Sequence, residues 1–140
     1  MKLINYKISK DFIALELGNA YLDLHNNFDF ISIEYRFSEK SIILKWTKST
    51  GEWVPKDIPT SVTLTFSGVY LFKSKERDSE IPFSEDACLE SIGFIGNDLI
   101  EDINGFFSME PVENQNHLNI SFASGFAIKI GADFSNCILS

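Results

Sequence analysis

Three short turns constrain the fold of this 140-residue chain more than any other feature, because each predicts which residues pair across a β-hairpin. Loop length sets the register of a hairpin, and residues that pair on the core face must both be apolar. Gly18-Asn19 fits a two-residue type II′ loop, whose first central position favours glycine. The predicted pairs are all apolar: Leu17–Ala20, Leu15–Leu22 and Ile13–Leu24.

Two further turns predict registers in the same way. A four-residue loop from Ser38 to Ser41 predicts the pairs Phe37–Ile42, Tyr35–Leu44 and Ile33–Trp46. The loop Ala123-Ser124-Gly125 has glycine in its last place, where a three-residue hairpin needs a positive φ. It predicts the pairs Phe122–Phe126, Ile120–Ile128 and Leu118–Ile130. Three registers that each align apolar residues on one face indicate an antiparallel β structure.

Other segments add strands and one ambiguous element. Ser61 to Phe72 is predicted as a long strand, in which the apolar alternation changes parity at Ser67-Gly68, a sign of a bulge or bend. Leu3 to Ile8 and Phe106 to Met109 are predicted as further strands. Ser84 to Ile92 fits a two-turn helix begun by a serine cap and two acids, or equally a turn followed by a strand.

The predicted fold class is mainly β: an antiparallel meander of hairpins forming a sandwich or open barrel, with at most one or two short helices. Residues 1–140 are predicted to form a single domain, since their number suits one core. The residues expected to face that core are Leu15, Leu22, Ile33, Tyr35, Leu44, Val62, Leu64, Phe66, Ile120, Phe122, Phe126 and Ile128.

The charge of the chain is concentrated in residues 76–102. This stretch contains nine acids and a single base, Arg77, and therefore carries a net charge of −8, equal to that of the whole chain. Clustered charge steers and selects partners, so a partner protein with a basic surface is expected. The predicted partner-binding residues are Glu76, Asp78, Glu80, Glu85, Asp86, Glu90, Asp98, Glu101 and Asp102, together with the loop tryptophan Trp53. The alternative is that these acids only solvate loops, and that Trp53 only covers a local cluster.

Motifs for catalysis, cofactors or metals do not emerge from the sequence. His25 and His117 stand at strand ends without other ligands at metal-binding spacing. Cys88 lies among acids, which disfavour a thiolate, and Cys137 has no local activating group. We therefore predict a protein that is not an enzyme and has no cofactor and no metal site. The acidic balance also argues against a nucleic-acid partner.

The expected location is the cytoplasm. Lysines interrupt the N-terminal segment, which lacks the apolar run of a signal peptide. No stretch approaches the length of an apolar membrane span, so membrane association is not expected. In that setting the two cysteines are expected to be free thiols.

The second half of the chain resembles small all-β bacterial proteins, many of which are immunity proteins encoded beside toxins. The residues that suggest this are the strand Val62 to Val69, the acidic middle from Pro82 to Gly93, and the closing hairpin His117 to Ile130. The resemblance implies a partner-binding role, such as neutralising a basic toxin domain. The alternative function is binding of an apolar small molecule in a barrel or sandwich pocket, which the thirteen phenylalanines would suit.

Overall fold

The computed structural model describes residues 1–102, 104–111 and 117–140 and is built from short strands. The strands are β1 (Lys2–Leu3), β2 (Lys7–Ile8), β3 (Ala14–Leu17), β4 (Ala20–Asp23), β5 (Phe28–Arg36), β6 (Ser41–Lys48), β7 (Ser61–Ser67), β8 (Leu71–Lys75), β9 (Leu89–Phe94), β10 (His117–Phe122), β11 (Ala127–Gly131) and β12 (Phe134–Leu139). Two 3-10 turns, η1 (Phe83–Ala87) and η2 (Asn97–Leu99), are the helical segments of the described chain.

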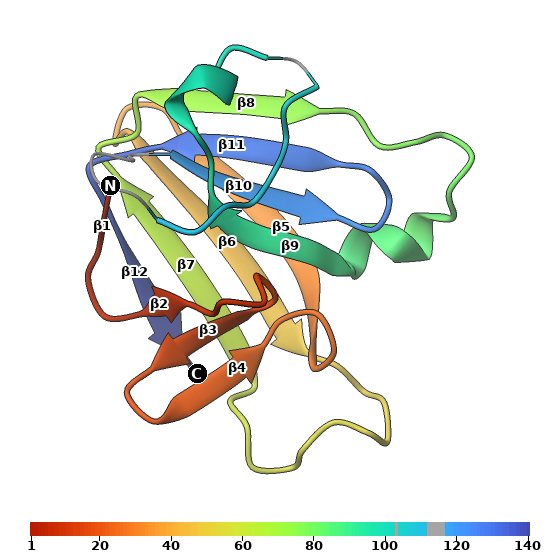
Figure 1. Cartoon of the computed structure of the whole chain (residues 1–140). Helices are drawn as coiled ribbons and strands as arrows, with labels where there is room; N and C mark the ends of the chain where they lie inside the picture. The colour runs from red at the N-terminus through yellow and green to blue at the C-terminus, as the bar shows by residue number, and fades with distance from the viewer. Residues whose placement is uncertain (103, 112–116) are drawn as a thin grey trace.

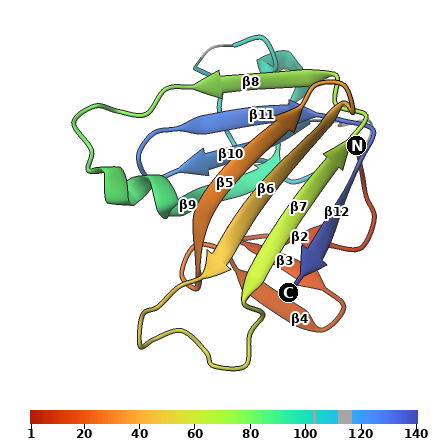
Figure 2. The same cartoon turned by 180° about the vertical axis from the view of Figure 1, so that it is seen from behind.

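These strands form three open sheets. The largest has the order β1-β12-β7-β6-β5, and the second has the order β8-β11-β10-β9. A small sheet, β2-β3-β4, lies beside the second one (Figure 1). Seen from behind, the strands of the two larger sheets cross steeply (Figure 2). The pairings between described strands are antiparallel except that of β1 with β12, and no described sheet closes into a barrel, so the mainly β prediction is confirmed.

The first and third hairpin registers are confirmed. Leu15 pairs with Leu22 across β3 and β4, and Ile120 pairs with Ile128 across β10 and β11. Gly18 has a φ of 58° and Gly125 a φ of 87°, values that glycine adopts without strain. Local turn chemistry therefore determined these two pairings.

The second hairpin register was predicted wrongly by two residues. Tyr35 pairs with Ile42 rather than Leu44, because the turn comprises residues 37–40 and includes Phe37. Lys40 closes this turn with a φ of 48° and donates its main-chain N–H to Phe37. Because side chains alternate with a period of two, this slip leaves each residue on its expected face.

The predicted strand from Ser61 to Phe72 is two strands in different sheets. β7 ends at Ser67 in the largest sheet, and β8 begins at Leu71 in the second. Gly68, with a φ of 68°, lies at the corner between them. The change in apolar parity therefore marks a crossing between sheets.

The structure also tests the predictions for three other segments. Residues 84–92 contain most of η1 and then the start of β9, so the alternative of a turn followed by a strand is correct. The segment Leu3 to Ile8 holds two short strands in different sheets, not one. Phe106 to Met109 forms no full strand, and Met109 makes an isolated bridge to Phe94.

One core cluster joins residues of all three sheets. Most of the predicted core residues are buried, but Tyr35 and Phe126 are only half-buried. Ile33 is 37% exposed, because β5 is the edge strand of its sheet and the second sheet does not fully cover it. The prediction for Ile33 was therefore wrong.

The polar outer face of the second sheet is also covered. Asn119 and Lys129 are fully buried there beneath the segment that follows β9. Asn119 donates to Ser108 and Ser121, and Lys129 donates to the carbonyl oxygens of Leu99 and Asp102. The irregular segment thus makes a third layer, held to the sheet by polar contacts.

Candidate functional site

The nine predicted acids lie in separate places. The acidic loop, defined as residues 76–86, projects beyond the β10–β11 hairpin, whereas Asp98 to Asp102 lie over the outer face of the second sheet (Figure 1). The acidic loop contacts Ser124, and the second group contacts Lys129, five residues along the hairpin. Ser124 lies in the turn of this hairpin and Lys129 lies within β11, so the two acidic groups are held at different parts of it.

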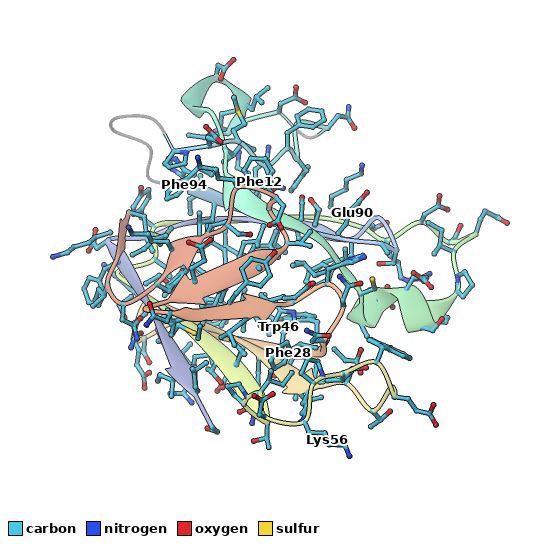
Figure 3. The ribbon with its side chains drawn as sticks, turned by 60° about the horizontal axis from the view of Figure 1, so that its bottom comes forward. Phe12, Phe28, Trp46, Lys56, Glu90 and Phe94 are labelled. Carbon is cyan, nitrogen blue, oxygen red and sulfur yellow. The ribbon has the colours of Figure 1, made fainter. Side chains whose placement is uncertain are left out.

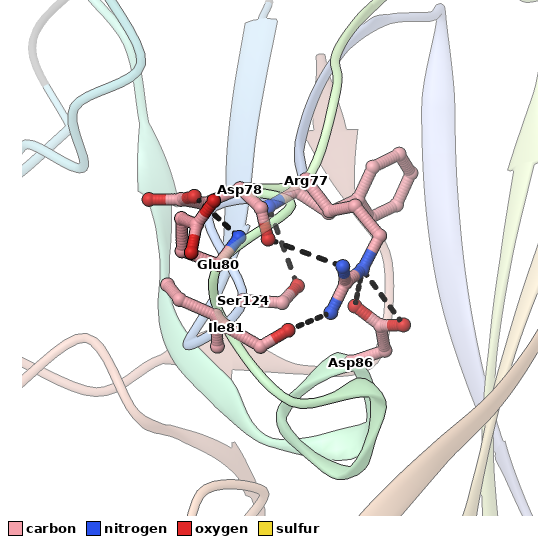
Figure 4. A network of polar contacts seen from close by, with 7 residues as sticks. Arg77, Asp78, Glu80, Ile81, Asp86 and Ser124 are labelled. Atoms are coloured by element: carbon pink, nitrogen blue, oxygen red, sulfur yellow. Dashed lines mark hydrogen bonds and ion pairs between the residues drawn. The ribbon is translucent and has the colours of Figure 1, made fainter.

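Arg77, the base of the acidic stretch, holds the acidic loop together (Figure 4). Its Nε donates to the Asp86 carboxylate at 3.0 Å and 3.2 Å. Its Nη1 donates to the carbonyl oxygen of Asp78 at 3.1 Å, and its Nη2 to that of Ile81 at 2.6 Å. The guanidinium also lies 4.2 Å from the centre of the Phe83 ring. Its positive charge is thus engaged inside the loop.

Two of the acids have structural partners of their own. Asp78 accepts the main-chain N–H of Glu80 at 2.9 Å, and its own N–H donates to the carbonyl oxygen of Ser124 at 2.8 Å. A hydrogen bond from the Ser124 side chain, with Arg77 adding to it, holds the pKa of Asp86 below its usual range. Asp86 therefore stays ionised and shapes the loop, leaving Glu76, Glu80 and Glu85 without a cationic partner among the described residues.

A groove of about 650 Å³ separates the acidic loop from β5. Its lining is mostly apolar and includes Phe30, Ile31, Ile33, Phe83, Ala87 and Phe126, with Arg77 and Asp86 at its polar side. Phe83 is 78% exposed, and Ile31 is about half exposed. Large apolar side chains gathered at a groove with a polar rim are typical of interaction sites.

β5 presents an open sheet edge beside this groove. Its nine residues pair with β6 on one side, and no described strand pairs with the other. The strand also contains a bulge at Ile31, between Phe30 and Ser32. An unpaired edge exposes main-chain donors and acceptors that can bind another extended chain.

The remaining predicted site residues lie apart from this groove. Glu90 is exposed on β9. Glu101 forms an ion pair with Lys73, and Lys73, with a smaller effect from Lys129, lowers the pKa of the Glu101 carboxyl group. Trp53 is 69% exposed in the loop between β6 and β7. That loop lies at the opposite end of the molecule from β8 (Figure 1). Its indole N–H donates to the carbonyl oxygen of Asn26 at 2.7 Å, so the side chain is anchored despite its exposure.

The fold brings Cys88 next to His25, a pair that the sequence separates by 63 residues. The thiol lies 3.7 Å from Nδ1 of His25, but Nδ1 also lies 2.5 Å from the carbonyl oxygen of Leu89. A carbonyl can only accept, so Nδ1 carries the proton and is not a base for the thiol. Burial raises the pKa of the Cys88 thiol, and the negative charges of Glu85, Asp29 and Glu90 raise it further. This arrangement does not activate a nucleophile.

Sequence reasoning missed the apolar half of the site. Ile31 and Ile33 belong to β5, and Phe83 belongs to η1, about fifty residues later. Only the fold brings these two segments to the same groove. The one local signal was Phe83, a large apolar residue inside an acidic segment. Within the described ranges, no three His, Cys, Asp or Glu side chains gather as metal ligands, and no helix has the length and hydropathy that crossing a membrane requires.

Comparisons with protein-family models, with curated proteins and with solved structures find no significant match to this chain. The function is therefore argued from the geometry of the groove, its edge strand and its charges.

Proposed function

We propose that this chain is a non-catalytic protein-binding module that captures an extended, basic segment of a partner protein. The observation that carries the proposal is the open edge of β5 next to an apolar groove bounded by the acidic loop. The partner segment would add a strand to β5, place apolar side chains in the groove, and bring Lys or Arg to the acids. The main chain would supply affinity, and the side chains would supply selectivity.

The charge distribution supports a basic partner. Arg77 is already engaged by Asp86 and by two carbonyl oxygens, so it does not neutralise the other acids of the loop. Glu76, Glu80 and Glu85 remain available to an incoming cation. Such complementarity raises the association rate and disfavours acidic competitors. More narrowly, we propose an immunity-type protein that neutralises a basic toxin domain. The support for this narrower role is the resemblance of the strands and turns to those of small bacterial immunity proteins.

Selection from a library of displayed random peptides tests this proposal and does not require the partner to be identified first. We expect enrichment of sequences that alternate apolar residues with Lys or Arg. In a titration followed by NMR, the bound peptide should shift the amide signals of β5 and of residues 76–86. Enrichment of acidic peptides, or signal changes confined to other surfaces, would contradict the proposal.

Two charge-matched variants locate the electrostatic contribution. One carries Glu76→Gln, Glu80→Gln and Glu85→Gln in the acidic loop. The other carries Asp98→Asn, Glu101→Gln and Asp102→Asn in the second group. Each removes three negative charges, but only the first should slow peptide association, by several-fold at low salt. Equal slowing by both variants, or association that salt does not affect, would favour acids that only solvate loops.

A third variant tests the edge strand. Ile33→Lys places a charge at the exposed edge and groove, which is how natural proteins block strand addition. It should weaken peptide binding at least tenfold while the circular dichroism spectrum stays that of the wild type. Unchanged affinity would exclude β5 as the docking strand.

A further inference from the structure

A second cavity, away from the acidic loop, lies where the N-terminal segment approaches the end of β9. It has a volume of about 520 Å³ and is open on one side. Its walls come from residues 1–12, from Phe94, and from Met109 to Pro111. Phe12 and Phe94 lie close together at this end of the molecule (Figure 3). The volume is within the roughly 300–1,000 Å³ of small-molecule sites.

The interior of this cavity is apolar. Its apolar lining includes Leu3, Tyr6 and Ile8 from the N-terminal segment, and Phe94 and Met109 from later in the chain. Tyr6 is buried and shares a hydrogen bond of 2.8 Å with Ser135, so its hydroxyl group is already satisfied. An occupant would therefore meet mainly hydrocarbon in the interior, where an alkyl chain gains about 0.8 kcal/mol for each buried CH₂ group.

Phe12 also lines the cavity, and its backbone is strained. Its φ is 62°, in the left-handed region that bulky residues rarely adopt. Two hydrogen bonds hold it: its N–H donates to Ser9 at 3.1 Å, and its carbonyl oxygen accepts from Ile92 at 2.7 Å. A side chain on Gly93 would come within 3.0 Å of the Phe12 ring, so the glycine leaves room for it. Maintained strain of this kind clusters at ligand sites.

The lining of the cavity also includes two exposed lysines, although the chain as a whole is acidic. Lys7 and Lys10 both line it, and the ion pairs of the described residues involve neither of them. The neighbouring Asp11 carboxylate is bound to the hydroxyl groups of Ser9 and Tyr21, and the bond to Ser9 is the larger cause of its lowered pKa. Among the described residues that line the cavity, Glu110 is the one acid, so the lining side chains carry an excess of one positive charge.

We infer that this cavity binds a single-chain carboxylate amphiphile, that is, a free fatty acid. The alkyl chain would lie between Phe12, Phe94 and Met109, and the carboxylate would lie at Lys7 and Lys10. The apolar interior selects the chain, and the two lysines select an anionic head over a neutral or cationic one. The lining of this site shares no residue with that of the groove beside β5, so its occupation can be tested separately from partner binding.

The experiment uses the 140-residue chain and three probes of equal chain length: dodecanoate and dodecyltrimethylammonium below their micelle concentrations, and dodecanol below its solubility limit. Isothermal titration calorimetry should give saturable one-to-one binding of dodecanoate. Binding of the other two should be at least several-fold weaker. The amide signals of Lys7 to Phe12 and of Met109 should shift in parallel in NMR spectra. Absence of saturable binding, or equal affinity for all three probes, would overturn the inference.

Variants separate the chain site from the charge site. Met109→Trp places a larger side chain in the lining of the cavity and should abolish binding. Met109 is 43% exposed and is not part of the core, so the replacement should leave the fold intact. The pair Lys7→Gln and Lys10→Gln should weaken dodecanoate binding several-fold but leave dodecanol binding unchanged. The matched pair Lys45→Gln and Lys75→Gln lies outside the cavity and should have no effect beyond long-range charge. Equal losses in both lysine pairs, or full binding by Met109→Trp, would overturn it.

Discussion

The ammonium group of Lys129 lies 2.6 Å from the main-chain carbonyl oxygen of Asp102, a residue of an irregular segment 27 positions earlier in the chain. The same ammonium group donates to Leu99 and lies 4.3 Å from the centre of the Phe106 ring. The carbonyl oxygens of Leu99 and Asp102 each also accept one main-chain N–H, from Asp102 and Gly105 respectively, and a carbonyl oxygen can accept two hydrogen bonds. Lys129 supplies the second, charged donor and so attaches the third layer to the sheet, together with the contact of Asn119 with Ser108.

Replacing Lys129 with methionine should detach this layer. Methionine keeps the length of the side chain but removes every donor, so the carbonyl groups of Leu99 and Asp102 lose their charged hydrogen bonds and keep only those from the main-chain N–H groups of Asp102 and Gly105. We expect a loss of about 2–4 kcal/mol in the free energy of unfolding, measured with urea, and faster amide exchange over residues 98–102 and 104–106. Lys73→Met is the control, because its exposed ion pair with Glu101 contributes less than about 1 kcal/mol. Equal losses for both variants would contradict this role.

Alanine at Gly68 should destabilise the chain more than alanine at Gly18. Both glycines have a positive φ, of 68° and 58°, so each replacement introduces about 1–2 kcal/mol of backbone strain. A side chain at Gly68 would also lie 2.1 Å from the Asp133 carboxylate, whereas Gly18 faces open space. The double variant Gly68→Ala with Asp133→Ala removes the carboxylate but keeps Cβ of residue 133 at 3.0 Å, so it should recover part of the difference from Gly18→Ala in urea unfolding. No recovery would mean that backbone strain alone sets the cost.

Both thiols should react slowly with iodoacetamide at neutral pH. Burial and three nearby acids raise the pKa of Cys88, and burial raises that of Cys137 to about 11. Because only the thiolate is nucleophilic, Glu85→Gln should accelerate alkylation of Cys88 by about two- to threefold and leave Cys137 unchanged. Mass spectrometry of the labelled peptides would measure each rate. If Cys88 were alkylated faster than the cysteine of an unstructured peptide, a nucleophilic role for Cys88 would be supported instead.

His117 should make the chain less stable in mild acid. Burial lowers the pKa of its imidazole, so between the ordinary value near 6.5 and the lower folded value the unfolded chain binds the proton first. Stability is therefore complete above pH 6.5 and decreases as the pH falls through the folded pKa. Urea midpoints at pH 7.5 and 5 should differ for the wild type and differ less for His117→Phe. An identical decrease in both proteins would place the sensitive group elsewhere.

The sequence predicted pairing wherever a glycine turn defined the loop. Gly18 and Gly125 each need a positive φ, and both of their hairpins have the expected register. The turn before Ser41 has no glycine, and Lys40 adopts the positive φ instead. A register error of two residues keeps the same apolar face, so the alternation of Tyr35 with its neighbours could not reveal it.

The third layer and the groove were beyond sequence reasoning for a different reason. Asn119 and Lys129 alternate with apolar residues as a solvent-facing set would, yet both are buried. They are covered by the irregular segment after β9, where Ser108 accepts a hydrogen bond from Asn119 and two main-chain carbonyl groups accept hydrogen bonds from Lys129. Such contacts leave no periodic pattern in the sequence. In the same way, Ile31 and Phe83 meet only because β5 lies beside η1.

β12 lies between β1 and β7, so the largest sheet combines strands from both ends of the sequence. Lys2 pairs with Phe134, and Cys137 pairs with Leu64. During synthesis on the ribosome, β5, β6 and β7 can pair as soon as they emerge, but β1 has no partner in its sheet until Phe134 to Leu139 have been made. Contacts of such long sequence separation slow folding, because the connecting chain must be ordered first. The nascent chain therefore leaves one edge of β7 without its partner strand until β12 has been made, and an unpaired edge is a place where another chain can add.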